Sequence, residues 1–317
     1  VEVASGVRAE FTEAGHMLGS TSIRLSIDDS GEARRIVFSG DLGPLNAPIL
    51  KDFEPFTRAD VVVMESTYGD RDHRPFAATV EEFLKVVGEA AARKGRILAP
   101  TFAVGRAQVL IMLLAWAFRE GRLPRFPVFL DSPMAVEATE ICRRHPELFD
   151  EEMTRFLRDG RIADDLSTLR ATPSAEESKA INHAEGPWLV MAGAGMCNAG
   201  RILHHLRNHL WKKDTTILIT GYQSEGSLGR QLVDGARKVR IFGETVAVNA
   251  SVHTLGGFSG HAGQTDLLKW LERMAPSRPR VVLTHGDERG RRPLASMIER
   301  RWSLDVSCPM LRDTITV

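Results

Sequence analysis

Five polar side chains that can bind a metal or move a proton stand beside short apolar stretches of this sequence. Asp41, Glu65 and His285 each end or follow an apolar run, and His16 and His261 lie in glycine-flanked turns. Histidine and carboxylate groups are ligands of catalytic zinc, which keeps one position open for water. Turns at strand ends hold such groups rigidly and let backbone approach a ligand. The set predicts one metal-dependent hydrolytic site.

Each of these residues also has an ordinary structural explanation when it is taken alone. A single histidine at a strand end is more often a hydrogen-bonded structural residue. Asp41 precedes a Leu-Gly pair and is typical of a turn residue. Glu65 is also explained as a buried carboxylate bonded to backbone amides, and His261 as a residue before a helix that begins near Gln264. The hydrolytic site is favoured because all five occur together.

Hydrophobic patterning divides the chain into a β-rich part and an α/β part. Residues 1–69 predict strands at 7–12, 21–27, 34–38 and 61–64, with a hairpin turn at 28–31. From about residue 76 helices and strands alternate, which predicts a parallel sheet with helices on its faces. The last part predicts alternating strands at 239–255, helices at 264–274 and 292–302, and closing strands at Val306 and Ile315. The fold class is therefore α/β.

Composition restricts the cellular setting and the kind of partner. The chain has 317 residues, 43% of them hydrophobic, and its 41 basic and 41 acidic residues leave no net charge. Nucleic-acid binding must then rest on a local patch rather than on a basic excess. The three cysteines are far apart, which favours a reducing cytoplasm without disulfides. No signal peptide or membrane-spanning run is recognisable, so we expect a cytoplasmic globular protein that does not contact a membrane.

Five segments carry a resemblance to a known family. They are Gly15–Ser20, Ser39–Asp41, Glu65–Gly69, Phe258–Ala262 and Thr284–Gly286. In order and spacing they resemble successive motifs of the β-CASP branch of the metallo-β-lactamase superfamily, which includes RNase J and the nuclease subunit of the pre-mRNA cleavage and polyadenylation factor. The likeness is greatest to the shorter prokaryotic RNA-degradation members and runs over essentially the whole chain.

The resemblance implies a partial αββα metallo-β-lactamase domain that is interrupted by an inserted domain. Residues 1–69 and 258–317 would form the metallo-β-lactamase part, and residues 70–257 the β-CASP domain with its parallel sheet. The expected activity is zinc-dependent hydrolysis of RNA phosphodiester bonds, by an endonuclease, a 5′ exonuclease or both, in RNA processing or degradation.

The resemblance also assigns roles to the five polar residues. Two zinc ions are implied, with His16 as a ligand of the first, His285 as a ligand of the second and Asp41 bridging both. Two metals would activate the bridging water and neutralise charge on the phosphodiester. His261 would donate a proton to the leaving oxygen, and Glu65 would orient its ring and favour the protonated form.

Single-stranded RNA is the partner that the resemblance implies, and loops that join strands to helices would contact its phosphates. The expected phosphate-binding residues are Arg106, Gly195, Met196, Arg201, Ser224 and Ser259. A glycine-rich loop is also explained as a tight turn, and Tyr222 either stacks on a base or is buried. A homodimer is left open.

One family motif is absent from this sequence. Members carry a His-x-His-x-Asp-His motif before the position of His16, and nothing like it occurs here, while His73 stands alone. Val1 begins in what reads as the middle of a strand, so we expect an N-terminally truncated, impaired chain of an active enzyme. The alternatives are a non-catalytic scaffold, a DNA-directed nuclease and a hydrolase of small thioesters or lactams. The presence of Asp41, His261 and His285 argues against the scaffold, and the large inserted domain argues against the small substrates.

Overall fold

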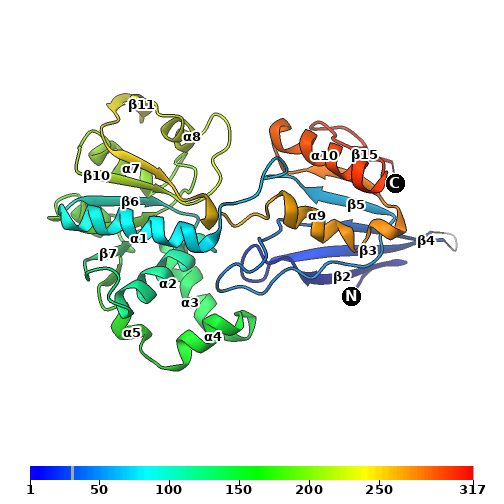
Figure 1. The fold of residues 1–317 in the computed structure, drawn as a ribbon, viewed down its shortest axis with the longest axis horizontal. Helices are drawn as coiled ribbons and strands as arrows, with labels where there is room; N and C mark the ends of the chain where they lie inside the picture. Colours follow the sequence, from blue (N-terminus) through cyan, green and yellow to red (C-terminus); the bar gives the residue numbers. More distant parts are fainter. Residues whose placement is uncertain (30–31, 317) are drawn as a thin grey trace. The chain divides into compact units, whose positions relative to one another are not determined.

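The chain folds into two compact units (Figure 1). The computed structural model describes residues 1–29 and 32–316. Unit 1 is made of Val1–His73 and Gly260–Val317, and unit 2 is the intervening Arg74–Ser259. These limits lie within a few residues of the expected domain limits, 69/70 and 257/258, and the assignment of the units to functional domains stays a prediction.

The described part of unit 1 contains a seven-stranded sheet in the order β1-β2-β3-β4-β5-β14-β15. Its strands are β1 (Glu2–Ala4), β2 (Val7–Glu13), β3 (Thr21–Asp29), β4 (Glu32–Phe38), β5 (Val61–Glu65), β14 (Arg280–Thr284) and β15 (Val306–Ser307). β3 is antiparallel to both β2 and β4, and β5 is parallel to both β4 and β14. β2, β4, β5 and β14 therefore run in one direction, and their carboxyl ends lie along one edge of the sheet.

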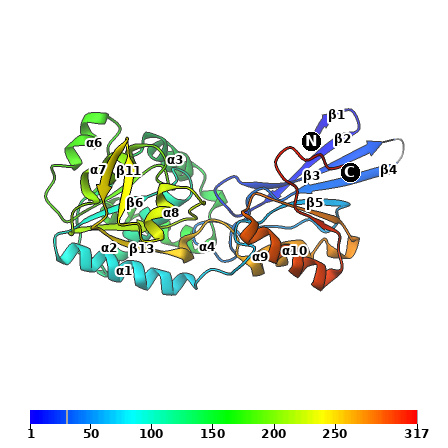
Figure 2. The same ribbon diagram turned by 90° about the horizontal axis from the view of Figure 1, so that it is seen from above.

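Alternation of side chains gives this sheet two different faces. One face packs on helices: Met64 shares a core with Trp270 and Leu294, which are all fully buried (Figure 2). The helices are α9 (Gln264–Glu272) and α10 (Glu288–Trp302), with a short turn η3 (Ala275–Ser277). On the opposite face Phe11 and Phe38 flank β3 in register, and they are 52% and 38% exposed.

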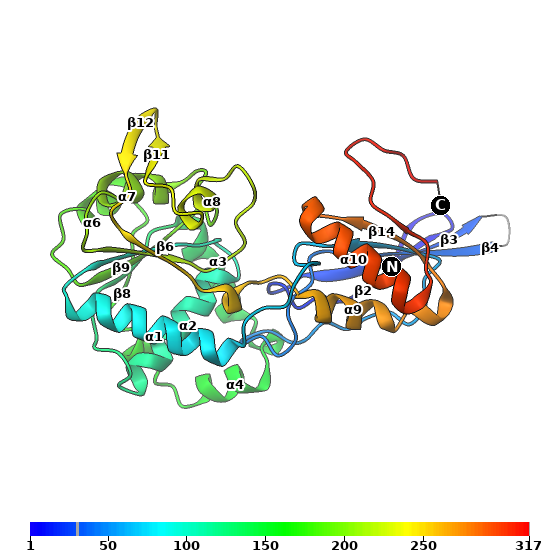
Figure 3. The same ribbon diagram turned by 45° about the horizontal axis from the view of Figure 1, so that its top comes forward.

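Unit 2 is built on a six-stranded parallel sheet in the order β13-β10-β6-β9-β7-β8, counted over the described residues. The strands are β6 (Arg96–Pro100), β7 (Val128–Leu130), β8 (Leu169–Ala171), β9 (Trp188–Ala192), β10 (Thr215–Ile219) and β13 (Ser251–Thr254). Continuous burial along β9 and β10 agrees with strands covered on both sides. A hairpin of β11 (Lys238–Ile241) and β12 (Glu244–Ala247) projects from this unit (Figure 3).

Helices cover both faces of the unit 2 sheet. One core joins Leu110 and other residues of α1 and α2 to Ile97 of β6, and another joins Leu206 of α7 to Leu98 of the same strand. The helices of unit 2 are α1 (Phe76–Ala92), α2 (Arg106–Arg119), α3 (Pro133–Arg144), α4 (Glu151–Arg158), α5 (Ile162–Asp165), α6 (Ala175–Ile181), α7 (Arg201–His209) and α8 (Leu228–Val233), with short turns η1 (Pro146–Leu148) and η2 (Gly256–Phe258). The predicted α/β class, with its parallel sheet between helices, is confirmed.

Most predicted elements are found, with two differences near the C-terminus. The strand expected at Ile315 is wrong: that residue lies outside β15, after a turn in which Leu311 is 93% exposed and Arg312 has a φ of +79°. The helix expected from residue 292 begins earlier, at Glu288, because Pro293 is accommodated inside α10 rather than at its start. The expected turn at 28–31 includes residues outside the described part of the chain.

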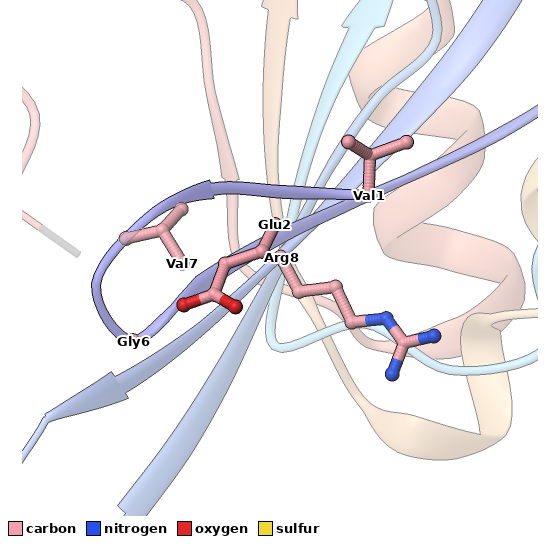
Figure 4. A pocket seen from close by; sticks show the side chains of 5 residues that line it. All are labelled: Val1, Glu2, Gly6, Val7 and Arg8. Atoms are coloured by element: carbon pink, nitrogen blue, oxygen red, sulfur yellow. The ribbon is translucent and has the colours of Figure 1, made fainter.

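A pocket lies beside the β1–β2 hairpin, and none of the residues that line it is a predicted site residue. It is lined by Val1, Glu2, Gly6, Val7 and Arg8 (Figure 4). Glu2 and Arg8 are register partners on the two antiparallel strands. The pocket contains no histidine and takes no part in the candidate site.

Gly43 brings two of the site turns together. Its N–H donates to the carbonyl of Ala14 at 2.8 Å, and Leu42 forms a bridge with Gly15. A Cβ atom at position 43 would lie 1.9 Å from the carbonyl oxygen of Gly15, so the turn that holds His16 must move away when any side chain is added.

Gly43→Ala is therefore expected to lower the free energy of unfolding by about 1–3 kcal/mol, the usual cost of overpacking. Denaturant unfolding of the chain measures this change. Gly256→Ala is the control, because nothing lies within 4 Å of a Cβ built there. Equal unfolding midpoints for the two variants would contradict the expectation.

Candidate metal centre

Four strands of unit 1 present the candidate site at one edge of the sheet. His16 follows β2, Asp41 follows β4, Glu65 is the last residue of β5 and His285 follows β14. Because these strands run in the same direction, the four residues meet at the carboxyl ends, where ligands of such sheets commonly bind. His261 joins them from the turn before α9.

Hydrogen bonds shape the turns that carry these residues. The hydroxyl of Ser20 accepts from the N–H groups of His16 and Met17, at 3.1 and 3.2 Å, and so closes the first turn. In the turn before Asp41, the hydroxyl of Ser39 accepts from the N–H of Glu65 at 2.9 Å, which ties the end of β4 to the end of β5.

The five side chains gather as the sequence predicts. The carboxylate of Asp41 lies 4.0 Å from Nε2 of His16 and 3.4 Å from Nδ1 of His285. Nδ1 of His261 lies 3.1 Å from Oε1 of Glu65. The ring of His261 is 4.5 Å from the ring of His16 and 5.5 Å from that of His285, measured between centroids. All these contacts are within unit 1.

Two overlapping sets of these residues have the donor atoms and spacing of a metal site. Ligand atoms of His16, Asp41 and His261 lie within 4.8 Å of one another, and so do those of Glu65, His261 and His285. A combination of imidazole nitrogen and carboxylate oxygen suits Zn²⁺. The donor set therefore fits zinc, and Asp41 stands between two histidines as a bridging carboxylate would.

His16 is held in the form that binds a metal. Nδ1 lies 2.9 Å from the carbonyl oxygen of Gly260, which can only accept, so Nδ1 carries the proton and donates it. Nε2, on the Asp41 side, then keeps its lone pair. Burial lowers the pKa of His16, and the nearby His261 lowers it further, so the neutral ring is favoured. A neutral imidazole with its second nitrogen bonded to a carbonyl is the usual arrangement of a zinc ligand.

His285 is fixed by its backbone as well as by its ring. It has a φ of +45°, and the N–H of Ser66 donates to its carbonyl oxygen at 3.3 Å. The hydroxyl of Thr67 lies 3.2 Å from Nδ1 of His285 and donates to the carbonyl of the same residue, also at 3.2 Å. The next residue is glycine because a Cβ there would lie 2.6 Å from the carbonyl oxygen of Ser66.

Glu65 satisfies both explanations that the sequence leaves open for it. Its side chain is almost fully buried, and it accepts from the backbone N–H of Leu42 at 2.6 Å and of Thr67 at 3.3 Å. Nδ1 of His261 is its third partner, at 3.1 Å. Burial alone would raise the pKa of Glu65, but the hydrogen bonds from His261, Thr67 and Leu42 lower it below its ordinary value. Glu65 is therefore an ionised carboxylate that orients the ring of His261.

Two residues that hold the site have no role in the sequence analysis. Thr67 contacts both His261 and His285 through its hydroxyl. Nε2 of His73 donates to the carbonyl oxygen of His261 at 2.7 Å, and the His73 ring packs edge-on against Tyr68 with centroids 4.4 Å apart. His73 belongs to no ligand motif in the sequence, but the structure gives it a supporting contact with the turn of His261. No spacing signal reveals such contacts, because the partner of His73 is a backbone carbonyl.

The expected phosphate-binding residues are in unit 2, where two loops bring several of them together. The hydroxyl of Ser224 donates to the sulfur of Met196 at 3.2 Å, and the carbonyl of Gly195 accepts from Gln223 at 2.9 Å. Arg106 begins α2, and Ser259, which is 3% exposed, is the last residue of this unit. Contact with phosphate stays a prediction for all of them.

Arg201 has internal partners that phosphate would have to replace. It donates to Asp131 at 2.8 Å and to the carbonyls of Thr172 and Pro173 at 2.5 and 2.7 Å. Burial of Asp131 acts to raise its pKa, but hydrogen bonds from His205 and its other partners, Arg201 among them, lower that pKa to about 2. The ionised Asp131 therefore holds the guanidinium in place.

Comparison with known proteins agrees with this arrangement. Residues 107–232 match the family described as the Beta-Casp domain, and residues 245–309 match the Zn-dependent metallo-hydrolase RNA specificity domain. The chain is 44% identical over 279 residues to Ribonuclease TTHA0252 of Thermus thermophilus, a match that covers 88% of this chain and 62% of that protein. The second family description supports the use of zinc.

Archaeal relatives are similar over nearly the whole chain. It is 30% identical to Transcription termination factor FttA of Methanococcus maripaludis, over 99% of this chain and 50% of that protein. It is also 30% identical to FttA of Methanocaldococcus jannaschii, over 100% of this chain and 51% of that protein. The chain thus spans only about half the length of these termination factors.

No helix in the described part of the chain is long and apolar enough to cross a membrane.

The family that the sequence motifs indicated is confirmed by two family matches in sequence order and by relatives that are similar along the chain. The α/β fold, in which the region matching the Beta-Casp domain lies between the two sequence stretches of unit 1, agrees with the same family. The chain belongs to the β-CASP branch of the metallo-β-lactamase superfamily.

Proposed function

We propose that this chain is part of a zinc-dependent hydrolase of RNA phosphodiester bonds, an endonuclease, a 5′ exonuclease or both, in RNA processing or degradation. The observation that carries the proposal is the gathering of His16, Asp41, Glu65, His261 and His285 at one sheet edge. Ribonuclease TTHA0252, at 44% identity, supports RNA as the substrate. Cleavage of a labelled single-stranded RNA, compared with DNA of the same sequence, tests the substrate class.

His16, Asp41 and His285 are the residues that would hold zinc, with two ions in a complete site. Bound zinc would supply an activated water and neutralise charge on the phosphodiester. Asp41, which has one carboxylate oxygen toward each histidine, would supply negative charge to both cations. The carbonyl of Gly260 orients the ring of His16 so that Nε2 faces the site.

His261 and Glu65 would transfer the proton. Nδ1 of His261 lies 3.1 Å from Oε1 of Glu65, and we assign the donation of a proton to the leaving oxygen to Nε2. The ionised Glu65 stabilises positive charge on that ring. His73, through the carbonyl of His261, restrains the turn that carries the proton donor.

The same observations leave a second role for His261, because its ring belongs to both candidate ligand sets. The tests use the extended enzyme, which is this chain carrying the family's His-x-His-x-Asp-His segment at its N-terminus. Zinc content and turnover measured together distinguish a proton donor from a ligand.

His261→Ala in the extended enzyme is expected to lower turnover of single-stranded RNA by about 10²- to 10⁴-fold, the usual contribution of general acid catalysis, with zinc content unchanged. Single-turnover cleavage and elemental analysis give the two values. His145→Ala is the matched control, because that histidine is exposed and its ring pairs with Glu147 in unit 2, outside the candidate site. If zinc is lost with His261, it is a ligand and the proton-donor role is wrong.

Asp41→Ala is expected to lower both zinc content and cleavage, because the bridging carboxylate is removed. The loss of affinity should be at least the roughly 10- to 100-fold typical of changes outside the ligand shell. Zinc titration of the variant measures it, with the exposed Asp28→Ala of unit 1 as control. Full zinc and full cleavage in the Asp41 variant would remove this residue from the site.

The 317-residue chain itself is expected to bind fewer than two zinc ions and to cleave RNA poorly, because ligands that the family takes from the missing motif are not in its sequence. Elemental analysis of this chain and of the extended enzyme, with cleavage assays on both, measures the difference. A chelator should abolish cleavage by the extended enzyme. Two zinc ions in the unextended chain would show that other side chains, such as His73, complete the site.

We infer a cytoplasmic enzyme from the three widely separated cysteines, and a homodimer stays open. The FttA relatives are named transcription termination factors, so cleavage of nascent RNA is a second candidate role. The higher identity to the ribonuclease favours processing or degradation.

A further inference from the structure

In the unit 2 sheet, the connection that leaves β6 leads to one side of this strand, and later connections lead to its other side. The order in which strands are added to the sheet therefore reverses at β6. From β6 the chain passes through α2 toward β7, and from β9 it passes through α7 to β10 on the other side of β6. α2 and α7 pack on opposite faces, since α2 shares a core with Ile97 and α7 shares one with Leu98. Open α/β sheets bind ligands at the carboxyl ends of strands at such a reversal.

Phe102 occupies this position. It is the second residue after β6, and it is 43% exposed, whereas Phe83 and Phe258 of the same unit are buried. A single exposed apolar side chain is ordinary on a protein surface. The surroundings of the ring are what distinguish this one.

The ring of Phe102 rests on the backbone of the two loops that follow the neighbouring strands. A Cβ atom at Gly195, after β9, would lie 2.6 Å from Cε2 of the ring, and one at Gly221, after β10, would lie 3.6 Å from the same atom. A side chain at position 195 would displace the ring. Because residue 195 is a glycine, one edge of the Phe102 ring can pack against its backbone while Phe102 stays accessible to solvent.

Hydrogen bonds restrain the two loops that contact the ring of Phe102. The side-chain amide of Gln223 donates to the carbonyl of Gly195 at 2.9 Å and to that of Gly221 at 3.3 Å. The N–H of Gly229 donates to the carbonyl of Met196 at 3.1 Å. The two loops are thus joined beneath the ring, so little conformational freedom remains to be lost when a flat ligand stacks on it.

We propose that Phe102 is a stacking platform for one nucleobase of single-stranded RNA bound along the carboxyl edge of the unit 2 sheet. The inference rests on the proposed function and adds a substrate-contacting residue to it. A flat ring that offers no hydrogen-bonding group of its own accepts any base, which suits a hydrolase that follows a strand without reading its sequence.

The test is the affinity of the 317-residue chain for a fluorescent single-stranded oligouridine, measured by anisotropy with a chelator present so that no RNA is cut. Phe102→Ala is expected to bind about 5- to 150-fold more weakly, which corresponds to the energy of stacking one base. Phe102→Tyr should bind like the unchanged chain. Phe242→Ala is the matched control, because Phe242 is 53% exposed on the β11–β12 hairpin.

An oligonucleotide with abasic positions separates stacking from an indirect effect on folding. The unchanged chain should lose affinity when bases are removed, whereas the Phe102→Ala chain should lose less, because its stacking contact is already gone. Thermal unfolding followed by circular dichroism checks each variant. If Phe102→Ala does not fold, Phe102→Leu serves instead, since leucine keeps apolar contact with the loops but lacks the aromatic face.

The outcomes distinguish this inference from the function on which it rests. Equal affinity of the unchanged and Phe102→Ala or Phe102→Leu chains, in a protein that binds the RNA, overturns the stacking role and leaves the hydrolase proposal standing. An unchanged chain that binds none of the oligonucleotides overturns the stacking role together with RNA as the ligand of this unit. If the Phe102→Ala chain binds more weakly than the unchanged chain, and only to oligonucleotides that carry their bases, the stacking role is supported.

Discussion

The buried charge of Glu65 is the interaction on which the geometry of the candidate metal centre depends. A carboxylate without solvent is costly unless every oxygen has a partner. The partners here are the N–H groups of Leu42 and Thr67 and the ring of His261, which come from three separate turns. Satisfying this charge therefore fixes the turn after Asp41, the end of β5 and the approach to α9 at once. The spacing of the candidate metal ligands His16, Asp41 and His285 therefore depends on the hydrogen bonds of Glu65.

The register of the parallel strands supplies the other constraint. Thr284 is the partner of Glu65 across β14 and β5, so His285 leaves the sheet beside the buried carboxylate. The inward face of these strands carries Met64 and Leu283, both fully buried under the helices. Since a slip of one residue would turn these side chains outward, the hydrophobic core fixes which residues reach the edge. The alternation of side chains along these strands therefore fixes both the residues that pack in the core and the residues that reach the candidate site.

This coupling explains how much of the site could be predicted from sequence. Asp41 and His285 each follow an apolar run, and His16 lies in a glycine-flanked turn, so these polar residues can be picked out from the sequence alone. Thr67 and His73 were not recognised, because they act on a backbone carbonyl or share a hydroxyl between two rings. The internal binding of Arg201 by Asp131 was hidden for a similar reason: the two residues are 70 positions apart, and a basic residue that opens a helix looks the same with or without such a partner.

The two units use the same structural position for different chemistry. In unit 1 the carboxyl ends of parallel strands carry histidines and carboxylates, and the buried charge of Glu65 is balanced by hydrogen bonds from three turns. In unit 2 the corresponding ends carry glycine-rich loops and the exposed ring of Phe102. A nucleic-acid strand repeats one phosphate and one flat base at each step, so backbone amides and an aromatic face suffice to bind it. On the proposed function, binding by such groups would add no net charge, which agrees with the equal numbers of basic and acidic residues in this chain.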